Sequence, residues 1–173
     1  LSNILKSAGA VLGKQTVINY VGYMMDSYLL FTLQNYAAKL VEKETSPKYY
    51  FMDTGLLGLM LMDCSSAQLE NLVAIELIRR YGRENVFYFE KNVEIDFYVP
   101  EEKLAIQVSL QVLDQIDTRE REIGAFVKLK NFIGDATCLL ITNSEEEELD
   151  YEGVHVSVVP VWKWLLQNRK QDI

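Results

Sequence analysis

The chain has 173 residues, and 17 basic against 25 acidic side chains give it a formal net charge of −8 at pH 7. Apolar residues account for 49% and charged residues for 24%, which is typical of a folded domain and excludes disordered and collagen-like chains. No apolar run approaches the roughly 20 residues that cross a bilayer, so we expect no contact with a membrane. The two cysteines, Cys64 and Cys138, have no partner at metal-ligand or disulfide-framework spacing. These features predict a cytoplasmic globular protein.

The first 60 residues are predicted to form a winged-helix-like segment. Residues 2–9 have the pattern of a short helix that ends at Gly9, and helical spacing of apolar residues returns from Lys14 to Asp26. Two extended segments, residues 28–36 and 48–53, follow these helices. Two helices joined by a glycine-containing turn and followed by two strands are the order of a winged helix.

The start of the second predicted helix is where a helix-turn-helix places the residues that read nucleic acid. The candidates there are Lys14, Gln15, Thr16 and Asn19. The acidic balance of the chain argues against phosphate binding, which needs clustered Lys and Arg. Winged helices also bind proteins, so we favour a protein partner over a nucleic acid, and both remain open.

Residues 61–173 are predicted to form an α/β (α+β) domain with a mixed sheet. Ser65 and Gln68 fit a capping box, and the helix that they begin ends before Gly82. The elements expected after this helix are strands at 86–90, 93–99 and 104–112, a helix at 118–132, a strand at 137–142, an acidic loop at 145–148, a strand at 154–159 and a helix after Pro160. Helices interspersed among strands predict a sheet flanked by helices.

The strands at 93–99 and 104–112 form a predicted hairpin with polar residues on one face. The odd-numbered residues from 93 to 99 are apolar, so alternation places Glu94, Asp96 and Tyr98 on the other face. The turn predicts that opposed residue numbers add up to 203, which sets Asp96 across from Gln107 and Glu94 across from Ser109. Opposed Cβ atoms lie about 4.5 to 5.5 Å apart, close enough for two oxygens to reach one hard cation. Alternation with an outward acid also describes most half-exposed strands, so this pattern alone is weak evidence.

Four sequence phrases strengthen the hairpin pattern: YFMDTGL at 50–56, LENLVAIEL at 69–77, VEIDF at 93–97 and AIQVS at 105–109. Together they resemble the C-terminal domain of a prokaryotic AAA-type ATPase family, whose members read E-N-x-V-A-x-E-L, then E-x-D-F, then I-E-V-K. That family in turn resembles the PD-(D/E)XK nuclease superfamily. The resemblance implies a restriction-endonuclease-like fold and an ATPase module upstream, in a longer protein of which this sequence is a piece.

The resemblance also implies roles for individual residues. It places the helix acid on Glu70, the strand acid on Asp96 and the E/Q-x-K element on Gln107 and Ser109. In active members two acids hold Mg²⁺, the metal polarises a phosphate oxygen and activates water, and the lysine stabilises charge. Ser109 carries no charge and is too short to replace the lysine, and losing one such group typically costs on the order of 10² to 10³ in rate. We therefore expect vestigial catalytic residues at all four positions.

The metal ligands implied by the resemblance are Glu70, Asp96 and Gln107. With only two charged ligands, Mg²⁺ binding is expected to be weak or absent. Glu70 also has a purely structural explanation, because an acid in the first turn of a helix is favoured by the helix dipole.

The expected function is a non-catalytic accessory or interaction region that acts with its ATPase module and contacts a nucleic acid or a protein. No nucleotide is expected to bind, because the glycines near Lys14 do not have phosphate-loop spacing. The alternative is a Mg²⁺-dependent DNA or RNA phosphodiesterase in which another lysine, Lys91 or Lys103, replaces the lost one.

Overall fold

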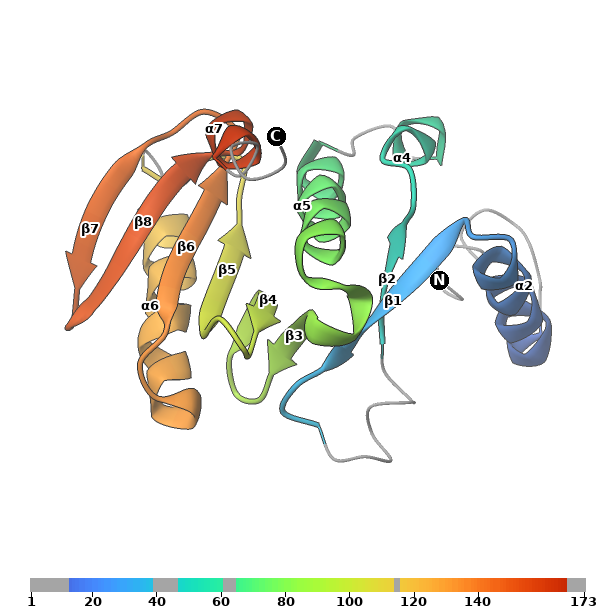
Figure 1. Ribbon diagram of the computed structural model, residues 1–173, viewed down its shortest axis with the longest axis horizontal. Coiled ribbons are helices and arrows are strands. Elements are labelled where there is room, and N and C mark those ends of the chain that lie inside the picture. Colours follow the sequence, from blue (N-terminus) through green and yellow to red (C-terminus); the bar gives the residue numbers. More distant parts are fainter. Residues whose placement is uncertain (1–12, 39–46, 61–64, 114–115, 168–173) are drawn as a thin grey trace.

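The computed structural model describes residues 13–38, 47–60, 65–113 and 116–167. Its centre is an eight-stranded sheet of order β2-β1-β3-β4-β5-β6-β8-β7, flanked by helices (Figure 1). The strands are β1 Leu30–Asn35, β2 Lys48–Phe51, β3 Phe87–Glu90, β4 Glu94–Val99, β5 Leu104–Val108, β6 Thr137–Thr142, β7 Glu147–Tyr151 and β8 Val154–Pro160. The α-helices are α2 Lys14–Asp26, α4 Gly55–Met60, α5 Ser65–Tyr81, α6 Ile116–Ile133 and α7 Val161–Leu166.

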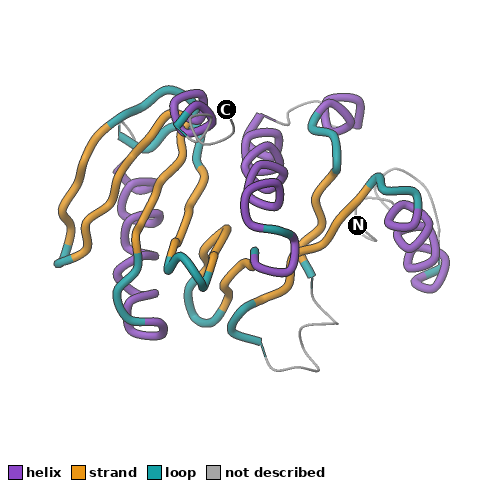
Figure 2. Tube along the Cα trace, in the orientation of Figure 1, coloured by secondary structure: helices purple, strands orange, loops and turns teal. Residues whose placement is uncertain are grey.

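The sheet is mixed, as the sequence predicts. β1 pairs parallel with β3, and β5, β6 and β8 run parallel to one another, whereas the remaining pairs are antiparallel. In Figure 2 the helices lie beside the strands of the sheet, and α2 lies at one end of the molecule. The fold is therefore α+β with a mixed sheet flanked by helices, which confirms the predicted fold class.

Two hydrophobic clusters pack on the two faces of the sheet. The first joins Val73 and Leu77 of α5 and Trp164 of α7 to the sheet. The second joins Phe126 and Leu129 of α6 to it. A sheet covered on both faces buries its central strands completely, and this explains why polar side chains on them need specific partners.

The predicted strand alternation is wrong within β4. Ile95 and Tyr98 belong to the cluster under α6, whereas Phe97 and Val99 belong to the cluster under α5. The β3–β4 pairing shifts register between its pairs at Phe87 and Phe89, and such an irregularity reverses the faces of the residues beyond it. The predicted β4–β5 register is confirmed, because all three pairs from Phe97 to Val99 have numbers that add up to 203.

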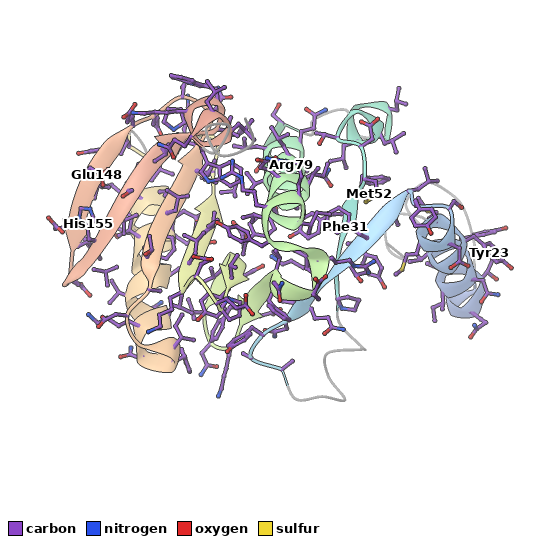
Figure 3. The ribbon with its side chains drawn as sticks, in the orientation of Figure 1. Tyr23, Phe31, Met52, Arg79, Glu148 and His155 are labelled. Carbon is purple, nitrogen blue, oxygen red and sulfur yellow. The ribbon has the colours of Figure 1, made fainter. Side chains whose placement is uncertain are left out.

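The acidic run at 145–148 is a second correction, because its last two residues belong to β7 instead of a loop. β7 pairs antiparallel with β8 at the edge of the sheet. On this strand Glu148 faces solvent, with its Oε2 atom 3.2 Å from Nε2 of His155 on β8 (Figure 3). Charged residues are common on edge strands because they prevent pairing with other chains.

The helix at Lys14–Asp26 is confirmed, whereas the predicted helix at 2–9 lies outside the described residues. The two strands that we assigned to a winged-helix-like segment, β1 and β2, lie in the same sheet as β3 to β8. The sheet therefore continues across residue 60, where we expected one unit to end. The division into two domains remains a prediction.

Asn71 fastens α5 to the end of β2. Its side chain, which is 2% exposed, accepts the Phe51 N–H through Oδ1 at 2.7 Å and donates through Nδ2 to the Phe51 carbonyl at 3.0 Å. The same Nδ2 lies 3.2 Å from the hydroxyl of Thr54. One buried amide thus satisfies both backbone groups of a strand residue and sets the position of α5 against β2.

Replacing Asn71 with alanine is expected to lower the free energy of unfolding by about 1 to 3 kcal/mol, because it leaves partly buried backbone groups of Phe51 without this partner. Urea unfolding followed by circular dichroism measures this change. Asn143→Ala, at an exposed position, is the matched control and is expected to stay within about 0.5 kcal/mol of the wild type. Equal losses in the two variants would contradict the anchoring role of Asn71.

Candidate functional site

One pocket brings together three of the four residues to which the resemblance assigns catalysis. It is lined by Glu70 from α5, Asp96 from β4 and Gln107 from β5. The other residues that line it are Val93, Glu94, Val108, Arg121, Glu122, Ala125 and Lys128, the last four from α6. Helix acid, strand acid and amide therefore share one site, although they lie far apart in the sequence.

Glu70 is positioned by its neighbour on β2. The Tyr50 hydroxyl donates to Glu70 Oε1 at 2.8 Å, and the adjacent Asn71 holds the same strand. Burial, followed by the charge of Glu70, raises the pKa of Tyr50 well above its ordinary value. The phenol is therefore protonated near neutral pH and can donate to Glu70 there.

Gln107 completes the hairpin where its backbone pairing ends. The last backbone pair of β4 and β5 towards the pocket is Phe97 with Ile106. Beyond it, Gln107 Oε1 accepts the Asp96 N–H at 2.9 Å, and Gln107 Nε2 donates to the Glu94 carbonyl at 3.1 Å. The side-chain amide thus takes the place of backbone ladder bonds, which is a structural role.

The environment of Asp96 strongly shifts the pKa of its carboxyl group. Its Oδ2 atom accepts the Val108 N–H at 2.9 Å, and its Oδ1 atom lies 3.7 Å from Lys48 Nζ. Burial, followed by the charge of Glu70, raises the pKa of Asp96 from 3.8 to about 7. Lys48 and the Val108 N–H act in the opposite direction but do not outweigh burial.

Sequence reasoning missed Lys48, which lines a neighbouring pocket that also contains Glu70 and whose ammonium reaches two acids of the first pocket. Its ammonium lies 2.6 Å from Glu94 Oε1 and 5.3 Å from the centroid of the Tyr88 ring, so its side chain extends from β2 past β3 to β4. Burial by itself lowers the pKa of Lys48, but the bond to Glu94 and the charges of Asp96 and Glu70 outweigh it and raise that pKa. No sequence motif marks Lys48, because it is the first residue of a strand and lies 46 residues before Glu94.

The fourth predicted residue, Ser109, is not among the residues that line the pocket. Its hydroxyl donates to the Gln111 carbonyl at 3.2 Å. The two lysines proposed as replacements do not line it either. Lys91 lies over the Phe132 ring, 5.5 Å from its centroid, and Lys103 occupies the β4–β5 turn with a positive φ of 47°.

The predicted nucleic-acid-binding residues lie on α2, away from the pocket. Figure 3 places Tyr23 of α2 at the far end of the molecule from His155 of β8. On α2, Gln15 donates to the Asn19 side chain at 3.1 Å, and both residues are exposed. Lys14 and Thr16 belong to the same first turns of the helix. None of the residues that line the pocket of Asp96 belongs to α2.

The oxygens of the pocket do not fit a divalent metal as they stand. Each predicted ligand is already bonded within the protein, as Glu70 to Tyr50 and Asp96 to Val108 show. In the part of the chain that the structure describes, no group of three or more His, Cys, Asp or Glu side chains is placed to hold a metal ion. A hard cation needs several free oxygens, and here an ammonium group lies beside them instead.

Comparison with known proteins finds a family model that covers part of this chain and a longer relative of which the chain covers part. Residues 1–68 match the model of a family described as a domain of unknown function, DUF8612. The chain is 32% identical over 176 residues to an uncharacterized protein of Methanocaldococcus jannaschii, covering 96% of this chain and 40% of that protein. No solved structure matches the chain. Neither matching name mentions an ATPase or a nuclease.

Among the described residues, none of the helices has the length and apolar character that crossing a membrane requires.

The raised pKa of Asp96 predicts a specific dependence of stability on pH. Between pH 4 and about 7 the folded protein retains a proton that the unfolded chain has lost, so the carboxyl group stabilises the fold less as the pH rises. The free energy of unfolding of Asp96→Asn, which does not titrate, is expected to rise relative to the wild type across this interval and to level off above it. Urea unfolding at several pH values measures the difference.

The matched control is Asp135→Asn, at a side chain that is 89% exposed and pairs with Lys130 at the surface. Its difference from the wild type is expected to change little from pH 4 to 7. If the Asp96→Asn curve ran parallel to the wild-type curve, the raised pKa of Asp96 would be wrong.

Proposed function

We propose that the chain is an accessory region of an AAA-type ATPase family protein and carries a nuclease-like domain that does not cleave nucleic acid. The observation that carries this proposal is the ammonium group beside the carboxylates of the pocket. Its acids and amide converge as in a nuclease, yet an ammonium group lies at 2.6 Å from one carboxylate and 3.7 Å from another.

The convergence of Glu70, Asp96 and Gln107 supports the nuclease-like part of the proposal. The helix acid and the hairpin acid are 26 positions apart in the chain and line one pocket of a mixed α/β sheet. A shared surface for these two acids is what the resemblance requires. The fold brings the two acids into one pocket, but the reaction that the pocket can support depends on which of its side chains are free to bind a ligand.

The lack of cleavage is supported by Gln107 and Ser109. The oxygen of the Gln107 amide accepts the Asp96 N–H, and its nitrogen donates to the Glu94 carbonyl. The oxygen is therefore already engaged with the hairpin backbone and is not available as a free metal ligand. Ser109 stands where the family has lysine, and its hydroxyl bonds to the Gln111 carbonyl. Without a preorganised charge on the transferred phosphate, transition-state stabilisation is lost.

The interaction role is supported by α2 and by the charge of the chain. α2 exposes Ile18, Tyr20 and Tyr23, which are 51%, 53% and 62% accessible. Exposed aromatic residues are enriched at protein interfaces, and a net charge of −8 disfavours a polyanionic partner. The partner that the resemblance implies is the ATPase module of the same longer protein, and the relative is in fact longer, since the alignment covers 40% of it.

A second candidate function is a Mg²⁺-dependent nuclease, and Lys48 is the observation that favours it. A lysine from β2 at the edge of the pocket would restore a positive charge that Ser109 cannot supply. In this reading Lys48, in place of Lys91 or Lys103, is the migrated lysine.

An activity assay decides between the two functions. Plasmid DNA, single-stranded DNA and single-stranded RNA are incubated with the protein in Mg²⁺ or Mn²⁺, and the products are separated by electrophoresis. We expect no cleavage above that of the Asp96→Ala variant, because the pocket does not fit a metal. Cleavage by the wild type that disappears in both Asp96→Ala and Lys48→Met would overturn the proposal and establish the nuclease.

A further inference from the structure

We propose that the Lys48 ammonium, which reaches Glu94 and Asp96 from the neighbouring pocket, is the resident cation of these two carboxylates, and that it excludes divalent metal ions by occupying the position between them. The proposal rests on the function proposed above for the identity of the pocket as a nuclease-like site. It deepens that function by naming the group that keeps the site inactive.

The charges that face the pocket make a cation necessary. Four carboxyl groups line it: Glu70, Glu94, Asp96 and Glu122. Carboxylates brought together in a partly buried site repel one another, so the site needs either protons or positive charge. The raised pKa of Asp96 reflects burial and the charge of Glu70. A cation that approaches Asp96 therefore stabilises the charged form of the site.

Lys48 is better placed for this role than the two cations on α6. Arg121 is bonded to Glu122 at 2.5 Å, and its side chain is 72% exposed. Lys128 lines the pocket from the same helix and is exposed. The Lys48 side chain is only 25% exposed, and its ammonium contacts carboxylate oxygens of both Glu94 and Asp96. It alone of the three cations has a short contact to Glu94 and approaches Asp96 within 4.0 Å.

The position of Lys48 is fixed by the elements around it. Its backbone pairs with Leu33 of β1, and its side chain passes the Tyr88 ring of β3 before it reaches β4. Two residues further along the same strand, Tyr50 holds Glu70, and Phe51 is held by Asn71. The strand that supplies the ammonium is thus the strand that positions the helix acid.

Competition with metal follows from this placement. A divalent ion that binds Asp96 must displace the ammonium or accept its repulsion at a distance of a few ångströms. A neutral side chain at position 48 removes that competitor and leaves the carboxylates uncompensated. The pocket should then bind a divalent cation more tightly, and the cation should stabilise the fold by mass action.

The test is isothermal titration of MnCl₂ into the full chain as wild type, Lys48→Met and Lys128→Met. Lys128→Met is the matched control, because it removes one positive charge from the lining of the pocket without touching the contacts of Lys48 to Glu94 and Asp96. We expect the Lys48→Met protein to bind Mn²⁺ at least tenfold more tightly than the wild type and the Lys128→Met protein to bind it as the wild type does. Melting temperatures measured with and without Mn²⁺ should show a rise that is largest for Lys48→Met.

Equal affinities in the wild type and Lys48→Met would overturn the proposal, and so would equal tightening in both variants, because that would reflect net charge alone. If Lys48→Met does not fold, Lys48→Gln decides, since it keeps a donor to Glu94 and loses the charge. These affinities are independent of cleavage. Nuclease activity of the wild type would overturn the proposed function, whereas unchanged Mn²⁺ affinity in the variant would overturn this inference without any cleavage being observed.

Discussion

The contact between the end of β2 and the first turns of α5 is the constraint on which the rest of the site depends. Asn71 binds both backbone groups of Phe51, and Tyr50 binds Glu70. These bonds join β2, which pairs with β1, to helix α5. They therefore fix the position of the β1–β2 hairpin against the helix. Because Lys48 lies on the same strand, the contact that positions the helix acid also positions the ammonium. All the residues that line the pocket follow residue 60, and Lys48 and Tyr50 contact its carboxylates from the other side of the predicted domain boundary.

Charge balance explains the state of the pocket. Burial raises the pKa of Asp96 to about 7, and the approach of Lys48 opposes that rise. The hydrogen bonds that Asp96 and Gln107 make to the hairpin backbone leave few oxygens free, and this favours a protein cation over a metal. The Lys48 and Glu94 side chains are 25% and 58% exposed, so this ion pair is only partly buried and adds little to the stability of the fold. In this account the ammonium keeps a nuclease-like arrangement intact while preventing metal-dependent chemistry.

Much of the fold was predictable from local patterns, whereas the meeting of the helix acid with the hairpin acid was predicted only through the family resemblance. The turn at Pro100 predicted the register of β4 and β5, and the pattern of Ser65 and Gln68 predicted where α5 begins. The faces of β4 were not predictable, since alternation assumes a regular strand and the pairing with β3 shifts register. Lys48 was not predictable either, because its partners lie on a strand that is not its neighbour in the sheet. Such a contact depends on the twist of the whole sheet and has no signal in sequence spacing.

The most direct test of the central claim is a crystal structure of the wild-type protein grown with Mn²⁺, with diffraction recorded at the manganese absorption edge. The account predicts no anomalous peak in the pocket, the Lys48 ammonium between Glu94 and Asp96, and Glu70 bonded to Tyr50. A manganese peak bound by Glu70 and Asp96, with Lys48 turned away from them, would contradict it.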